Sequence, residues 1–112
     1  MVNRDRDNDR QLYIGAVEPF RTELLHRDKP QALKVLEEAA EVVEAFKDWN
    51  KHGQTAEQRH DLIDECADVI QATVNLMAAM EFTDGEIRQA IEDCHARNDA
   101  RGRMTPHNDD SE

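Results

Sequence analysis

Two stretches decide the fold of this chain: Lys34–Phe46, which reads KVLEEAAEVVEAF, and Leu62–Met77, which reads LIDECADVIQATVNLM. In both, apolar residues recur at intervals of three and four, the period of an α-helix with one buried face. Both stretches are built mainly from good helix formers and contain neither Gly nor Pro. They are therefore predicted to be two long amphipathic helices, separated by a polar connection around HGQ.

Each of these helices carries an acidic pair with a spacing of three residues, at the edge of its apolar arc. The pairs are Glu38 with Glu41 and Glu65 with Asp68. Like charges three apart on a helix repel each other, and a charge placed near a buried face is costly without a partner. A divalent cation takes such carboxylate oxygens as ligands. The spacing therefore predicts a metal site where the two helices face each other.

Other residues on the same faces of these two helices as the acidic pairs, and a group near the carboxy terminus, are candidates for contact with a phosphorylated ligand. Lys34 lies one helical turn before Glu38, and Asn75 lies two turns after Asp68, where its amide is expected to meet a base edge. A basic cluster lies near the carboxy terminus, and a guanidinium group can donate two parallel hydrogen bonds to the oxygens of a phosphate. This basic cluster consists of Arg97, Asn98, Arg101 and Arg103.

The rest of the chain predicts a single all-α domain of the antiparallel four-helix-bundle type. The chain has 112 residues, with only 4 Gly and 3 Pro, and no strand-like alternation. Its apolar faces exceed what four short helices cover, so assembly into homodimers or homotetramers is expected. The predicted organisation is a flexible leader over 1–10, a helical domain over 11–103 with helices near 11–27, 28–50, 55–80 and 83–99, and a disordered tail over 104–112.

The charge balance narrows the range of partners. A net charge of −11 argues against binding to nucleic acid, whose phosphates would be repelled. It is compatible with a nucleotide delivered together with a cation, because the cation inverts the local field. The absence of an apolar run long enough to span a bilayer, and of a signal peptide at the first residues, predicts a cytoplasmic protein with no membrane partner.

The quoted residues also resemble a known family. LEEAAEVVEA followed by DECADVIQATVNL is similar to the MazG-like all-α nucleoside triphosphate pyrophosphohydrolases, whose signature is Glu-x-x-Glu, a variable gap and Glu-x-x-Asp. The signature maps onto Glu38, Glu41, Glu65 and Asp68, and the resemblance covers about residues 29–82. The same residues resemble phosphoribosyl-ATP pyrophosphohydrolase, a relative in histidine biosynthesis with the same chemistry.

The resemblance implies a hydrolase that cleaves an NTP or dNTP between the α- and β-phosphates, giving a nucleoside monophosphate and pyrophosphate. It implies Mg²⁺, with Mn²⁺ as a substitute, held by the four carboxylates of the signature. One carboxylate is expected to accept the proton of the attacking water. Glu38 and Glu41 are equal candidates for this base, and Glu37 is a weaker one. Phosphoribosyl-ATP is the alternative substrate.

A function of another class stays open at this point. Acidic strips also serve as solvated faces, and a non-catalytic helical interaction module would carry them to remain soluble or to pair with a basic partner. Such a module would be stabilised neither by divalent cations nor by nucleotides, whereas an enzyme of the expected kind would be stabilised by both through mass action.

Overall fold

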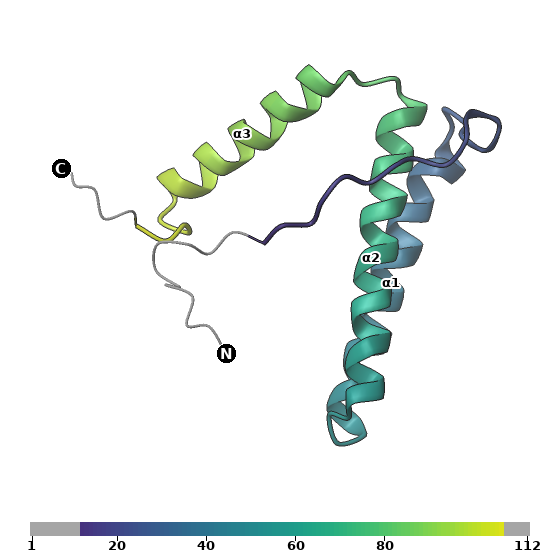
Figure 1. Cartoon of the computed structure of the whole chain (residues 1–112), viewed down its shortest axis with the longest axis vertical. Coiled ribbons are helices and arrows are strands. Elements are labelled where there is room, and N and C mark those ends of the chain that lie inside the picture. The colour runs from purple at the N-terminus through teal and green to yellow at the C-terminus, as the bar shows by residue number, and fades with distance from the viewer. Residues whose placement is uncertain (1–11, 107–112) are drawn as a thin grey trace. The chain divides into compact units, whose positions relative to one another are not determined.

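The computed structural model describes residues 12–106, in which every regular element is a helix (Figure 1). The elements are η1, a 3₁₀ turn (Thr22–Leu24), and the α-helices α1 (Lys29–Lys51), α2 (Ala56–Ala79) and α3 (Asp84–Ala100). The prediction of an all-α fold is confirmed, and the three long helices lie within a residue or two of their expected ranges. The expected leader over 1–10 and most of the expected tail over 104–112 lie outside the described residues.

The three α-helices begin where expected, because a side-chain oxygen before each one accepts a hydrogen bond from a backbone N–H of its first turn. The pairs are Asp28 with Gln31 (3.1 Å), Thr55 with Gln58 (3.2 Å) and Thr83 with Glu86 (3.1 Å). At α3 the bond is reciprocated, since Glu86 accepts from the N–H of Thr83 at 2.8 Å. At α1 and α2 the cap is one-sided, because the Gln31 side chain accepts from the His26 N–H and the Gln58 side chain accepts from the Thr55 hydroxyl.

The helix expected over 11–27 is wrong. Residues 12–21 are not helical, and η1 is the only helical turn before α1 in the described part of the chain. Pro19 lacks an N–H and disfavours helical geometry at the residue before it. Gly15 adopts φ +89°, a left-handed conformation that an α-helix does not contain. The described residues therefore contain three α-helices instead of the four expected.

Helices α1 and α2 run antiparallel and side by side as a hairpin (Figure 1). Their connection turns back at Gly53, whose φ of +87° is easily reached only without a Cβ. Ala72 of α2 is 4% exposed and Asn75 is 5% exposed, and these are the two buried residues among those described. Most side chains of the hairpin therefore keep part of their surface in solvent.

Part of the predicted apolar arc of α1 does not face α2. Leu36, Val43 and Phe46 are 65%, 56% and 49% exposed, whereas Val35 and Val42 of the same arc are half-buried. Ile63 of α2 is also 55% exposed. We call Leu36, Val43, Phe46 and Ile63 the exposed apolar set. Intramolecular packing of the described chain leaves this set in solvent.

Residues 16–82 form one compact unit, which contains η1, α1 and α2. Helix α3 belongs to a second unit, formed by the residues outside that range. No described helix combines the length and the hydropathy needed to cross a membrane. A single domain over 11–103 stays a prediction.

The segment before η1, residues 16–21, is extended and lies against α2; we call it the strap (Figure 1). Two side chains of α2 hold it. The Gln71 amide donates to the carbonyl of Glu18 at 2.9 Å, and the backbone N–H of Phe20 donates to Oδ1 of Asn75 at 2.9 Å. Gln71 also donates to the same Asn75 oxygen at 3.0 Å. Asn75 is therefore the shared acceptor of the contact between the strap and α2.

We expect Asn75→Ala to destabilise the fold by about 1–3 kcal/mol, because two donors at a shielded position lose their acceptor. Chemical denaturation of the full chain measures this. Asn50→Ala is the matched control, since the Asn50 amide is exposed and is expected to matter by less than about 0.5 kcal/mol. Equal stabilities of the two variants would contradict a structural role for Asn75.

Candidate metal and nucleotide site

Three of the four signature carboxylates meet between α1 and α2. Ligand oxygens of Glu38, Glu65 and Asp68 all lie within 4.8 Å of one another. Glu38 comes from α1 and the other two from α2, so their convergence results from the antiparallel packing of the hairpin. The Glu38 side chain is only 15% exposed. Three of the four carboxylates that the sequence analysis singled out on separate helices therefore form one cluster.

Glu65 is the most perturbed member of the cluster. Its Oε1 is shielded from solvent and has no hydrogen-bond partner among the described residues. Burial raises the pKa of the Glu65 carboxyl, and the neighbouring charges of Glu41 and Asp68 raise it further. A shielded oxygen without a donor is unfavourable, and such groups in native proteins usually have an ion or a water as partner. The residues present therefore suit a divalent cation.

Glu41 lies at the margin of the cluster. It is exposed and does not belong to the closest group of three, but its charge acts on the pKa of Glu65, and both residues line the same cleft. The fourth signature carboxylate is thus near the other three without joining their closest contact. Hard oxygen donors in this number match the ligands that Mg²⁺ and Mn²⁺ prefer.

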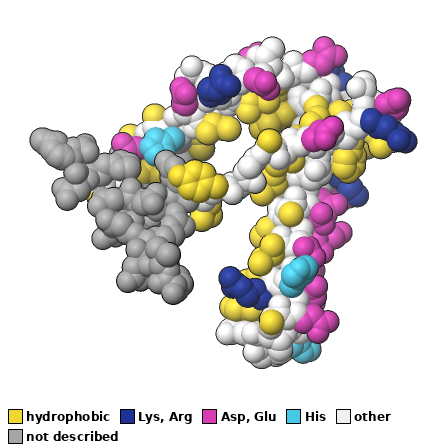
Figure 2. All heavy atoms as spheres, viewed as in Figure 1, with side chains coloured by type: hydrophobic (Ala, Val, Ile, Leu, Met, Phe, Trp, Pro, Cys, Tyr) yellow, Lys and Arg dark blue, Asp and Glu magenta, His cyan; other side chains and the backbone are white. Residues whose placement is uncertain are grey.

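A cleft of about 560 Å³ extends from Glu41 and Glu65 toward the connection between α1 and α2. Its lining is dominated by acidic groups, and Figure 2 shows acidic side chains gathered along this side of the hairpin. The residues that line it are Glu41, Glu44, Ala45, Asp48, His52, Glu57, Gln58, Asp61, Asp64 and Glu65. Such a lining attracts cations and repels the phosphates of a nucleotide that arrives without them.

Lys34, expected to reach a phosphate, is paired with carboxylates of its own helix. Its Nζ lies 3.5 Å from Glu37 and 3.6 Å from Glu38. The charge of Glu37, and to a smaller extent that of Glu38, raises the pKa of Lys34. The ammonium is therefore positively charged, lies beside the cluster and is 56% exposed. Its contact with a substrate stays a prediction.

Asn75, expected to contact a base edge, has its carbonyl oxygen engaged by Phe20 and Gln71. The oxygen therefore has a structural role in this arrangement, and contact of Asn75 with a substrate stays a prediction. The sequence reveals that Asn75 shares a bearing with Asp68, but it does not reveal a partner 55 residues away in the chain.

Arg97, Asn98 and Arg101, the remaining candidates, lie at the end of α3 in the second unit. Arg97 and Arg101 are exposed. Asn98 accepts from Arg103 Nη1 at 3.0 Å and donates to the Cys94 carbonyl at 2.9 Å, so it stabilises the carboxy-terminal turn of α3. A role of these residues in substrate binding stays a prediction.

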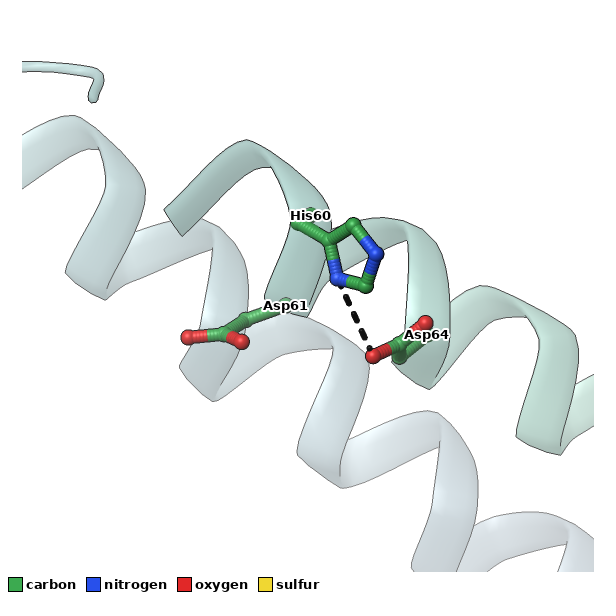
Figure 3. Close-up of side chains that lie close together, drawn as sticks. All are labelled: His60, Asp61 and Asp64. Atoms are coloured by element: carbon green, nitrogen blue, oxygen red, sulfur yellow. Dashed lines mark ion pairs between the residues drawn. The ribbon is translucent and has the colours of Figure 1, made fainter. Parts of the chain in front are cut away.

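A second acidic group, absent from the sequence analysis, lies near the start of α2, and two of its members, Asp61 and Asp64, also line the cleft. His60, Asp61 and Asp64 have potential ligand atoms within 4.8 Å of one another, and all three are exposed (Figure 3). Nδ1 of His60 lies 3.3 Å from Asp64, a pair at the helical spacing of four that the sequence could have signalled. The contact between His60 and Asp64 explains why these two side chains lie together without a bound ligand.

The comparisons with known proteins agree with this arrangement. The family profile described as phosphoribosyl-ATP pyrophosphohydrolase matches residues 15–98, which include all of α1 and α2 and the whole carboxylate cluster. Neither a curated protein nor a solved structure matches the chain. Since the match covers most of the sequence, the chain belongs to the phosphoribosyl-ATP pyrophosphohydrolase family, within the MazG-like all-α superfamily of nucleotide pyrophosphohydrolases, and is a hydrolase of phosphoric anhydrides.

Proposed function

We propose that this protein hydrolyses the anhydride between the α- and β-phosphates of a nucleotide at the carboxylate cluster, releasing a nucleoside monophosphate and pyrophosphate. The observation that carries the proposal is the convergence of Glu38, Glu65 and Asp68 within 4.8 Å, with one Glu65 oxygen shielded and unpartnered. Such a cluster is unfavourable by itself and becomes favourable around a cation that also binds phosphate.

The cation proposed is Mg²⁺, with Mn²⁺ as a substitute, held by Glu38, Glu65 and Asp68 together with Glu41. When bound, it would polarise the phosphate oxygens and offset the charge that develops during attack. The protein supplies the acceptor for the proton of the attacking water. Glu38 and Glu41 are equal candidates for that base, and Glu37, which is paired with Lys34, is a weaker one.

For the substrate we propose an unmodified NTP or dNTP, with phosphoribosyl-ATP as the second candidate. Both contain the anhydride that this reaction needs. The family match favours phosphoribosyl-ATP, because its description names that compound. The acidic cleft favours neither, since it repels any phosphate chain that is not neutralised by cations.

A nucleotide panel tests the reaction directly. We expect the full chain with Mg²⁺ to release pyrophosphate from at least one of the NTPs, dNTPs or phosphoribosyl-ATP. Glu65→Gln should lower the turnover at least about a hundredfold, because it removes a charged ligand while conserving shape. Glu23→Gln, which changes an exposed carboxylate in η1, should retain the wild-type rate.

Two results would contradict the proposal. Full activity of Glu65→Gln would show that the carboxylate cluster is not needed for the reaction. Alternatively, no pyrophosphate from any substrate, combined with no rise in melting temperature on adding Mg²⁺ and a non-hydrolysable nucleotide, would favour the non-catalytic interaction module.

The raised pKa of Glu65 predicts how metal binding depends on pH. A carboxylate must lose its proton before it binds a cation. As the pH is lowered, the affinity for Mn²⁺ should therefore begin to fall at a higher pH than it would with an unperturbed glutamate as ligand. In the metal-free protein the same shift stabilises the fold at acidic pH, and this stabilisation is lost as the pH rises through the raised pKa. Calorimetric titration at several pH values measures the affinity. A decline confined to the range of an ordinary glutamate would contradict the assignment of Glu65 as a ligand.

We also propose that the protein assembles into homodimers or homotetramers through the exposed apolar set. Leu36, Val43 and Phe46 lie on one side of α1, and leaving side chains of this size in water is unfavourable. Figure 2 shows hydrophobic side chains at the surface of the hairpin. A second copy offers the same kind of surface, as an interface between identical subunits requires.

Leu36→Glu should shift the assembly toward monomers, because the interface would have to bury an unpaired charge. Light scattering coupled to size-exclusion chromatography measures the mass. Thr22→Glu, which adds the same charge at the exposed η1, is the control and should leave the mass unchanged. A wild-type protein that is already monomeric at micromolar concentration would contradict the proposal.

A further inference from the structure

We propose that Phe20, on the strap, is the surface against which the base of the bound nucleotide stacks. The inference rests on the proposed function, because it takes the carboxylate cluster as the place where the phosphates bind. It concerns a residue outside the signature and outside all candidates of the sequence analysis. Its basis is the position of the strap on α2.

The strap is fixed on the same side of α2 as the carboxylate cluster. Asn75, which accepts from the Phe20 N–H at 2.9 Å, follows Asp68 by seven residues. At about 100° and 1.5 Å per residue, Asn75 lies about 20° from the bearing of Asp68 and about 10 Å further along the helix. The backbone N–H of Phe20 is thus held at Asn75, and the separation of about 10 Å between Asn75 and Asp68 along the helix is one that a ribose and a base can span.

The chemistry of Phe20 suits such a contact. Its side chain is 50% exposed, although its backbone is held by a hydrogen bond at a partly buried position. An aromatic face binds bases of any identity by stacking. Because Asn75 and Gln71 hold the backbone in place, little conformational entropy is lost when a ligand binds to this segment.

The opposite direction along the hairpin is unsuitable for the base. There the cleft is lined by carboxylates, with His52 as the one ring among its lining residues. Phe46 and Trp49 lie further along α1 in this direction, and their rings contact each other at 5.8 Å between centroids. Cations that accompany the phosphates fit this acidic end. The base is therefore directed toward the strap.

Binding measurements with two probes isolate the contribution of the base. The full chain is titrated with Mg²⁺ and either α,β-methylene-ATP, which has a base but resists hydrolysis at the bond in question, or imidodiphosphate, which has no base. We expect Phe20→Ala to weaken binding of the nucleotide by about 5-fold to 150-fold, the range for loss of one stacked base. Binding of imidodiphosphate should stay unchanged, and Phe20→Trp should restore binding of the nucleotide.

Leu24→Ala is the matched control. Leu24 is an apolar side chain that is also 50% exposed and lies four residues later, in η1. Its removal should leave both affinities unchanged. An equal loss in Leu24→Ala, or a loss of imidodiphosphate binding in Phe20→Ala, would show a general effect on the fold and overturn the inference.

The remaining outcomes separate this inference from the proposed reaction. If Phe20→Ala binds the nucleotide as tightly as wild type while the nucleotide panel yields pyrophosphate, only the stacking role fails. A wild-type chain that binds the nucleotide no better than imidodiphosphate, or binds neither probe, also overturns it. If nucleotide binding depends on Phe20 but no substrate is cleaved, the stacking role stands and the proposed reaction fails.

Discussion

Repulsion among the carboxylates of Glu38, Glu65 and Asp68 is the constraint on which the rest of the site depends. Oxygens of these three groups lie within 4.8 Å of one another, and burial together with the neighbouring charges of Glu41 and Asp68 raises the pKa of Glu65. The antiparallel packing of α1 and α2 holds these groups together. Packing energy of the hairpin thus maintains an arrangement that the charges oppose. Under the proposed function a cation would offset this repulsion, which is the argument for a ligand set over a solvated face.

One face of α2 carries both Asp68, which belongs to the carboxylate cluster, and Asn75, which holds the strap. Two turns beyond Asp68, Asn75 is uncharged and buried, and it satisfies a backbone N–H of the strap. A carboxylate at that position would have added to the negative charge of the cluster. An amide gives the acceptor without the charge. Asn75 therefore holds the strap without adding another negative charge to the face of α2 that carries Glu65 and Asp68.

The parts of this structure that were predictable from sequence are those set by local rules. The expected ranges placed α1, α2 and α3 almost correctly, and the structure shows side-chain caps at their starts from Asp28, Thr55 and Thr83. The three-residue spacing of the acidic pairs on two neighbouring helices was enough to predict that Glu38, Glu65 and Asp68 lie close together. The parts that failed depend on tertiary contacts or on competing local signals.

The strap shows why those parts failed. Residues 11–27 contain enough helix formers to suggest a helix, but Gly15, Pro19 and hydrogen bonds to α2 favour an extended chain. The acceptor role of Asn75 depends on that contact and is invisible in the sequence of α2 alone. The pairing of Lys34 with Glu37 and Glu38, by contrast, follows the helical spacings of three and four, and it was available to sequence reasoning.

Under the proposed function, the net charge of −11 would make cation and nucleotide binding interdependent. A phosphate chain approaching the cleft meets the charges of Glu41, Glu44 and Asp48 as well as the cluster itself, so its affinity there is low without cations. A cation held by the cluster would lower this barrier, and bound phosphate would raise the affinity for the cation. Linkage requires the two effects to be equal in free energy. The proposed enzyme would therefore select for the complex of nucleotide and cation over the free nucleotide, and the exposed aromatic ring of the strap would be available to the uncharged part of the substrate.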